Sequence, residues 1–492
     1  MLIFQTLYTI NTSMKNIFNG SSTFIKILNH GTVKVNSQDS LLARLFPLLL
    51  IFIISPVIWC QDSSLETAMT EISRLLSIRD YTSALILFNT LPPEHSGNAE
   101  IQILRASILN AAGKSAEARL IANNIIAENS RNTEALMILA DAAALENKDR
   151  ERRTFLDRVI GINPNHTRAL NDLANINLGN SNLRVAANYF DRALEADPDN
   201  GDALVGRASV YRYNRDPVSA ERLLNRAINL YPTWAGPLQE RARLYRSYGF
   251  YDDAIEDFST ALLIEPDNYW ILVDFGQTLM EVNQKLESLT VLEHAIRVSP
   301  NDFLAYAYSS AIKDELGDYA GAERDYLTLA RLKPDYYFAY EALGIIRMRN
   351  KQWAGARDAF LEAYRYAPLE FSYALLAAIN WMRAGRQADP RQFLSQVMRT
   401  APRDSLDYSM LRLYYDLSGD SNVTIMIENE RNIYEKSRML YYLASYYDIR
   451  GNRTLADRYY LMVQDLDAIN LLEWRINEII LAERGLGLRN AK

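Results

Sequence analysis

The residues that could do acid–base, nucleophilic or metal chemistry are few and scattered along the chain. The sequence has four histidines: His30, His95, His166 and His294. No two of them have the spacing that places two metal ligands on one helix, and neighbouring carboxylates such as Asp252 and Asp253 are typical of solvated helix starts. No phosphate-binding glycine loop, H-E-x-x-H motif or G-x-S-x-G motif occurs. We therefore expect a protein that is not an enzyme and that needs no cofactor or metal.

The composition of the 492-residue chain narrows the classes of partner. Hydrophobic residues make up 49% and charged residues 23%, which is typical of an ordered protein. A net charge of −7 opposes binding to phosphate backbones, so we do not expect a nucleic-acid partner. The only cysteine is Cys60, which excludes an intrachain disulfide and a zinc cluster of cysteines. Rigidity must then come from packing.

An apolar segment near the N-terminus predicts export from the cytoplasm. Residues 45–59 carry no charge, follow Arg44 and precede a polar run. Fifteen residues rise only about 22 Å as a helix, short of the roughly 30 Å hydrocarbon layer, so a signal peptide is favoured over a membrane span. We divide this region into a leader of uncertain start at 1–44 and an export signal or membrane anchor at 45–60.

Cys60 occupies the position of the acylated cysteine in a bacterial lipoprotein signal, which this segment partly resembles. Such signals usually carry a small residue before the cysteine, and here it is Trp59. Lipid attachment, ordinary signal cleavage and a cysteine without a role all stay open. Each predicts an exported protein in the periplasm or associated with an envelope membrane.

A proline recurs every 34 residues through the middle of the chain. The series is Pro164, Pro198, Pro232, Pro266, Pro300, Pro334, Pro368 and Pro402. Proline inside a helix loses a hydrogen bond and clashes with the preceding turn, so the series marks helix boundaries. Units counted from the third residue after each proline start at Thr133, Thr167, Gly201, Ala235, Tyr269, Phe303, Tyr337 and Phe371.

The interiors of these units agree with one another. Their eighth residue is always small: Ala140, Ala174, Ala208, Ala242, Gly276, Ser310, Gly344 and Ala378. In most units the twentieth residue is alanine and an aromatic residue follows four positions later, as with Ala356 and Phe360. Small residues admit a neighbouring backbone and the large ones fill the space beside it.

This pattern resembles the tetratricopeptide repeat, in which 34 residues form one helical hairpin. The resemblance implies an all-α fold, a right-handed superhelical solenoid of about twelve hairpins. We expect the solenoid over residues 65–470, with the best repeats at 133–404, weaker units from Leu65, Ala99 and Ser405, and a last clear unit from Ser437. Residues 471–492 are expected to form a capping helix and a tail, with the helix ending near Arg484. Pro390 predicts a late start for the second helix of its unit.

The family's geometry implies a concave groove lined by positions 2, 5, 9 and 12 of each first helix. On this basis we predict a partner-binding groove with a polar part holding Arg212, Arg243 and Arg246 and a largely apolar part holding Trp270, Gln277, Phe338, Ile345 and Met348. We expect about half of the apolar set to pack in the core and the rest to form an exposed patch. The three arginines are expected to form a positive strip that binds anionic groups.

Two functions stay open at this point. The first is a protein–protein interaction scaffold of the cell envelope, with peptide segments or components of envelope complexes as partners and membrane association through a signal anchor or lipid. The alternative is a ligand-binding partner protein of an envelope transporter or enzyme. A long open groove favours the scaffold.

Overall fold

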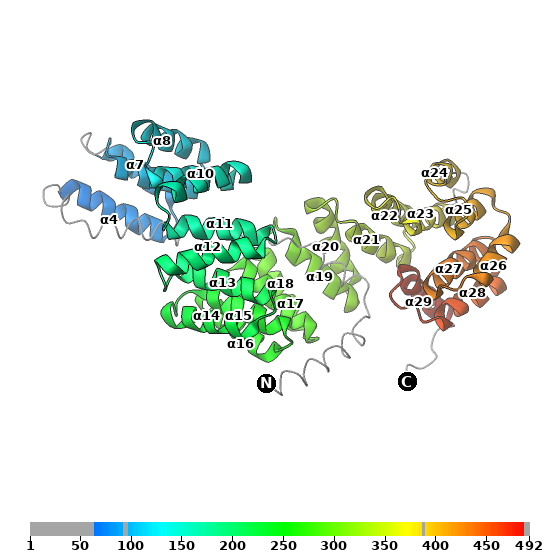
Figure 1. The fold of residues 1–492 in the computed structure, drawn as a ribbon. Helices are drawn as coiled ribbons and strands as arrows, with labels where there is room; N and C mark the ends of the chain where they lie inside the picture. The colour runs from blue at the N-terminus through cyan, green and yellow to red at the C-terminus, as the bar shows by residue number, and fades with distance from the viewer. Residues whose placement is uncertain (1–62, 92–96, 386–388, 487–492) are drawn as a thin grey trace. The chain divides into compact units, whose positions relative to one another are not determined.

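The computed structural model describes residues 63–91, 97–385 and 389–486. The leader, the apolar segment and Cys60 lie outside the described residues. Within the described part the regular structure is helical, and most helices pack in pairs with the next helix along the chain, with one further helix at the end (Figure 1). The predicted all-α solenoid of helical hairpins is thereby confirmed.

The first helices of the regular units begin at the predicted residues. They are α9 (Thr133–Leu145), α11 (Thr167–Gly179), α13 (Gly201–Tyr213), α15 (Ala235–Ser247), α17 (Tyr269–Glu281), α19 (Phe303–Glu315), α21 (Tyr337–Arg349) and α23 (Phe371–Arg383). Their partners are α10 (Asp149–Ile162), α12 (Leu183–Ala196), α14 (Pro217–Leu230), α16 (Tyr251–Ile264), α18 (Lys285–Val298), α20 (Tyr319–Leu332), α22 (Trp353–Tyr366) and α24 (Asp389–Val397). Helix α24 contains Pro390 and is described from Asp389 onward.

Less regular pairs flank this series. Before it come α4 (Ser63–Ser77), α5 (Tyr81–Leu87) with the 3-10 turn η1 (Phe88–Thr90), α7 (Ala99–Ala111) and α8 (Ser115–Glu128). After it come α25 (Leu406–Asp416), α26 (Asp420–Asn429), α27 (Ile433–Ile449), α28 (Arg453–Asp465) and α29 (Leu472–Arg484). Helix α27 begins four residues before the expected Ser437, because the side chain of Asn432 accepts hydrogen bonds from the amides of Tyr434 and Glu435 and so starts the helix earlier.

Side-chain caps and left-handed turns set the helix boundaries. Asn132 and Asn200 cap α9 and α13 by accepting from Ala135 N at 2.9 Å and from Ala203 N at 3.0 Å. Between the two helices of a unit the fifteenth residue adopts positive φ: Arg79, Gly113, Asn147, Ser181, Arg215, Gly249, Asn283, Gly317, Lys351, Gly385, Gly419 and Gly451, and Leu417 does so as well. This conformation reverses the chain within three residues, so the second helix packs back on the first.

The core repeats with the sequence. The predicted alanines at position 20 are fully buried, and so are the aromatic rings of Phe190, Phe258 and Phe360 four residues later. Where Ser288 replaces the alanine, its hydroxyl donates to the carbonyl of Gly276 at 2.6 Å. Small and large residues therefore interlock along the stack, as the spacing predicts.

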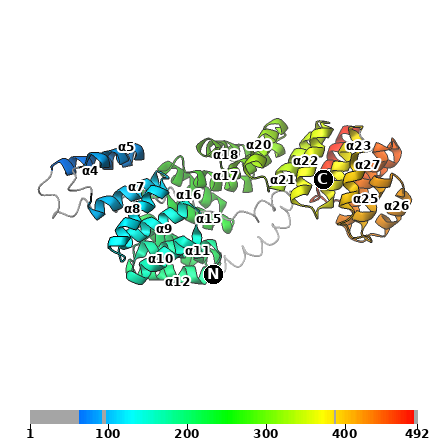
Figure 2. The same ribbon diagram turned by 90° about the horizontal axis from the view of Figure 1, so that it is seen from above.

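The helices separate into two compact units between Ser247 and Tyr248. In the described residues the N-terminal unit contains α4 to α15 and the C-terminal unit contains α16 to α29. Figure 2 shows the same helices from above, and in both views each pair within a unit lies next to the following one. Among the described residues, none of the helices is both long and apolar enough to cross a bilayer.

Candidate functional site

In the N-terminal unit two of the predicted arginines, Arg212 and Arg243, pair with one buried carboxylate. Arg212 at the end of α13 donates through Nε to Glu240 Oε1 of α15 at 2.7 Å, and Arg243 Nη1 lies 3.4 Å from Glu240 Oε2. The side chain of Glu240 is 6% exposed, and those of Arg212 and Arg243 are 18% and 23% exposed. Arg246, one turn after Arg243, is half-buried. We call Arg212, Glu240, Arg243 and Arg246 the arginine cluster.

The opposite charges of Glu240 and the arginines shift the pKa values of Glu240 and Arg212. Burial by itself would raise the pKa of Glu240, but the positive charges of Arg212 and Arg243 outweigh it and keep the pKa below the usual value. Burial opposes the charge of Arg212 as well, yet the Glu240 carboxylate raises the pKa of Arg212 above its usual value. Glu240 and Arg212 are therefore both charged at neutral pH. The predicted positive strip is in fact interrupted by a carboxylate, which the position-based prediction of the groove did not include.

Polar side chains also lie on the two preceding first helices of this unit, α9 and α11. Arg168 of α11 pairs with Asp141 of α9, and Asn171 Nδ2 donates to Asn200 Oδ1 at 2.8 Å. Asn171 Oδ1 is buried without a hydrogen-bond partner in the described structure. These residues stand at or next to the positions that face a groove in this family. The first helices from α9 to α15 thus carry alternating charges and amides on one face.

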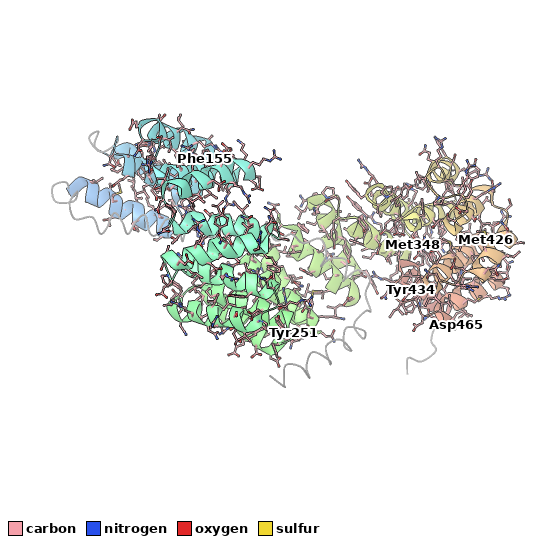
Figure 3. The ribbon with its side chains drawn as sticks, in the orientation of Figure 1. Phe155, Tyr251, Met348, Met426, Tyr434 and Asp465 are labelled. Carbon is pink, nitrogen blue, oxygen red and sulfur yellow. The ribbon has the colours of Figure 1, made fainter. Side chains whose placement is uncertain are left out.

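In the C-terminal unit the predicted apolar residues have a different environment. Phe338, Ile345 and Met348 are only 3%, 2% and 5% exposed, and Figure 3 places Met348 at the end of α21. Gln277 is 8% exposed and its amide donates to Glu281 at 3.3 Å. Trp270 is half-buried, with its ring edge-to-face against Tyr269 at 5.2 Å between centroids. Phe338, Ile345 and Met348 therefore belong to the part of the predicted set that packs in the core.

Two later helices explain the burial. All four groove positions of α21 and all four of α23 are buried: Phe338, Glu341, Ile345, Met348, Ser372, Leu375, Ile379 and Met382. Helix α27 reaches them through Tyr442, whose hydroxyl donates to the carbonyl of Ser372 at 3.2 Å, and through Asp448, 3.5 Å from Arg383. Helix α29 reaches them through Glu473, which accepts from the Ser372 hydroxyl at 2.5 Å. The chain itself therefore covers this side of α23, and the buried residues of α21 belong to the same core cluster.

Two acidic side chains at groove positions organise the contacts in the C-terminal unit. Asp314 of α19 is 5% exposed and pairs with Arg475 of α29, and Glu341 accepts from the hydroxyl of Tyr373 at 2.5 Å. Asp314 is the twelfth and Glu341 the fifth residue of its unit, so the repeat pattern predicts that both side chains face the groove. The repeat pattern gives no information about Arg475, which lies outside the repeats.

The two histidines in the described residues make local contacts. His166 caps α11 by accepting from Ala169 N at 3.2 Å, and His294 Nε2 lies 2.8 Å from Asp267 on the surface. Within the ranges that the structure describes, no group of three or more histidine, cysteine, aspartate or glutamate side chains could hold a metal ion. Both histidines thus have roles in local structure.

A family model for the tetratricopeptide repeat matches residues 171–233 and 312–371. These two stretches of the chain are tetratricopeptide repeats. Repeats of this kind generally bind other proteins or peptides and act as non-catalytic scaffolds. The two matched ranges include the N-terminal part of the arginine cluster, with Arg212, and the buried groove positions of α21, so both regions described above lie in or next to recognised repeats.

Several solved structures are similar to parts of the tetratricopeptide array. PilF of Pseudomonas aeruginosa is 17% identical with a TM-score of 0.38, covering 41% of this chain and 92% of that one. PilW, a type IV pilus biogenesis factor, is 20% identical with a TM-score of 0.33, covering 43% and 97%. A tetratricopeptide repeat protein of Parabacteroides merdae is 15% identical with a TM-score of 0.33, covering 50% and 98%. No curated protein matches the chain in sequence.

Proposed function

We propose that this protein is an exported scaffold of the cell envelope that captures peptide segments of partner proteins on the first helices of its N-terminal unit. The observation that carries the proposal is the arginine cluster. Arg212 and Arg243 come from successive first helices, stand at groove positions, and meet at one carboxylate while remaining partly exposed. Enrichment of arginine is typical of protein-binding surfaces.

The chemistry of the cluster favours an acidic peptide. A guanidinium offers five donors in a planar fork, so an arginine that already binds Glu240 can also bind a carboxylate or a backbone carbonyl of a partner. The alternating charges on α9 and α11 extend the surface along the unit, with Arg168 and Asp141 as one example. An extended peptide with carboxylates spaced along it would meet successive first helices.

Export is proposed on the sequence alone. The apolar segment 45–60 with Arg44 before it has the length and flanks of a signal peptide, and the chain that follows is an array with no expected catalytic site. A scaffold in the envelope fits both features. Soluble periplasmic placement and attachment through Cys60 are two forms of the same proposal.

The proposal is tested by affinity purification from the native envelope followed by mass spectrometry. The test variant is Arg243→Gln, which removes one charge and keeps Arg212 paired with the buried Glu240. The matched control is Arg222→Gln, an exposed arginine on the second helix α14 of the same unit. We expect a specific protein that co-purifies with the wild type and the control and is depleted at least about tenfold with Arg243→Gln, since a lost charge-assisted contact is worth about 1.5–3 kcal/mol.

The fold of each variant is checked by circular dichroism. The proposal is refuted if every protein recovered with the folded wild type is recovered equally with Arg243→Gln. Recovery of one small molecule in place of a protein would instead favour a ligand-binding role.

A further inference from the structure

The C-terminal helix α29 occupies the face of α19, α21 and α23 that corresponds to the binding groove of the repeats. It is not part of a helical pair, since the last pair ends with α28 at Asp465. Its residue Arg475 pairs with Asp314 of α19, and its residue Glu473 binds Ser372 of α23 and the hydroxyl of Tyr442, at 2.5 and 2.6 Å. These contacts join residues up to 161 positions apart in the chain.

The apolar part of the contact follows the same face of α29. Ile476, Ile480 and Leu481 are at most 9% exposed and belong to one buried cluster with Ile345 and Met348 of α21. Glu473 thus contacts the hydroxyl of Ser372 and Arg475 contacts the acidic Asp314, while Ile476 and Ile480 belong to the apolar core that includes residues of α21, α23 and α27. This is how an amphipathic helix binds a groove.

The fit of α29 also leaves buried polar atoms without partners. In the described structure, the indole nitrogen of Trp474 and the side-chain oxygen of Asn477 are buried and make no hydrogen bond. An unsatisfied buried polar group weakens a contact considerably. Arg475 remains 36% exposed although Asp314 is 5% exposed, so the charged contact is open to solvent on one side. Incomplete contacts are therefore found near Trp474 and Arg475, whereas the Asn477 amide donates to the Tyr460 carbonyl at 3.1 Å and Arg484 pairs with Asp448 and Asp457.

We propose that α29 is a ligand in cis: a resident helix that fills the groove of α19, α21 and α23 and can leave it, exposing a second binding surface. The surface is selective for a helix with the same spacing as Glu473, Arg475, Ile476 and Ile480 of α29. Such a helix has an acidic residue, an arginine two positions later, and isoleucines three and seven positions after the acidic residue. Its chemistry is apolar and anionic, in contrast to the arginine cluster. The proposal concerns the C-terminal unit alone and holds whether or not the N-terminal face binds a peptide.

The test uses the full chain and a fluorescein-labelled synthetic peptide of residues 470–486. In the wild type the tethered α29 competes at an effective concentration near the millimolar range, so the peptide should bind weakly. The variant Arg475→Glu weakens only the tethered helix and leaves the groove intact. We expect the apparent Kd of the peptide, measured by fluorescence anisotropy, to fall at least about tenfold in this variant. Arg431→Glu, an exposed arginine between α26 and α27, is the matched control and should behave as the wild type.

A second peptide carrying Arg475→Glu tests recognition, and it should bind the Arg475→Glu chain at least about tenfold more weakly than the native peptide does. Equal binding of both peptides, or binding of neither to a folded variant, would overturn the proposal. Mass measurement by light scattering checks the third outcome: a doubled mass would show that α29 fills the groove of a second copy, which contradicts a ligand in cis.

Hydrogen exchange on the wild-type chain keeps the proposal testable if Arg475→Glu does not fold. Amides of α29 should exchange as one group at least about tenfold faster than those of α27, because α29 leaves while the unit stays folded. An excess of the unlabelled peptide should increase that rate difference. Exchange of α29 at the same rate as α27 would show that it is a fixed part of the core.

Discussion

Gly206→Ala tests the way successive repeats interlock. Gly206 lies in α13, and a Cβ atom at this position would be 2.2 Å from Cζ and 2.3 Å from Cε1 of Phe190 in α12. Carbon atoms in favourable contact are about 3.5–4.0 Å apart, so the ring must move by about an ångström. Phe190 is fully buried, which prevents a free movement of the ring.

Two opposing terms determine how Gly206→Ala changes the free energy of unfolding. Overpacking a filled core costs about 1–3 kcal/mol, while alanine in place of glycine in a helix gains about 0.5–1 kcal/mol. We expect Gly206→Ala to lower the free energy of unfolding of the N-terminal unit by about 1–2 kcal/mol. The matched control is Gly161→Ala in α10, where a Cβ atom meets nothing within 4 Å, so only the gain remains.

The assay is urea denaturation followed by circular dichroism, with hydrogen exchange over α12 and α13 to locate the loss, because repeat proteins unfold in local segments. Phe190→Leu removes ring atoms and by itself should cost up to about 1.5 kcal/mol. Combined with Gly206→Ala it should cost less than the sum of the two, since the new methyl group fills the vacated space. If Gly206→Ala stabilises the chain as Gly161→Ala does, the ring does not lie against α13 and the argument fails.

Three further predictions follow from the turns, the ion pairs and the N-terminal segment. Arg215 has a φ of 60°, so Arg215→Gly should raise the free energy of unfolding by about 0.5–1 kcal/mol, and a lower melting temperature would contradict the assigned turn. The pKa of Glu240 in the folded protein lies below its ordinary value of 4.5, so its contribution to stability is present above about pH 4.5 and is lost as the pH falls through the folded pKa. Glu240→Gln should therefore remove this part of the loss of stability in acid, which is measured as the melting temperature against pH. If Cys60 is acylated, radioactive palmitate should label the wild type and leave Cys60→Ala unlabelled, whereas equal labelling of both would exclude lipid on Cys60.

The helices were predictable because their boundaries have local chemical causes. Proline cannot continue a helix, and the 34-residue series placed the starts of the first helices at the residues where the structure has them. Helix α27 begins at Ile433, four residues before the Ser437 start that the repeat spacing predicts, because the spacing carries no information about the cap Asn432. Local signals of this kind are sufficient to predict the helices but carry no information about contacts between residues that are distant in the sequence.

The exposure of the groove positions could not be predicted from the repeat frame. Arg212 and Ile345 were assigned to the groove by the same rule, yet one is partly exposed beside Glu240 and the other is buried. The difference comes from α27 and α29, which contact α23 and α19 over long separations in sequence. Asp314 and Arg475 are 161 residues apart, and their pairing depends on the curvature of the stack, which no short motif records.

A repeat array presents the same positions many times, so the segments outside the repeats decide which of those positions a partner can reach. In the C-terminal unit, α29 supplies an arginine to Asp314 and isoleucines to the strip near Met348. These are the kinds of contact that a foreign helix would make. A chain that fills its own groove in this way prevents exposure of a large apolar patch, which would otherwise favour aggregation. The same contacts limit binding there to helices that can replace Arg475 and the isoleucines, so the C-terminal helix protects the surface and also defines its selectivity.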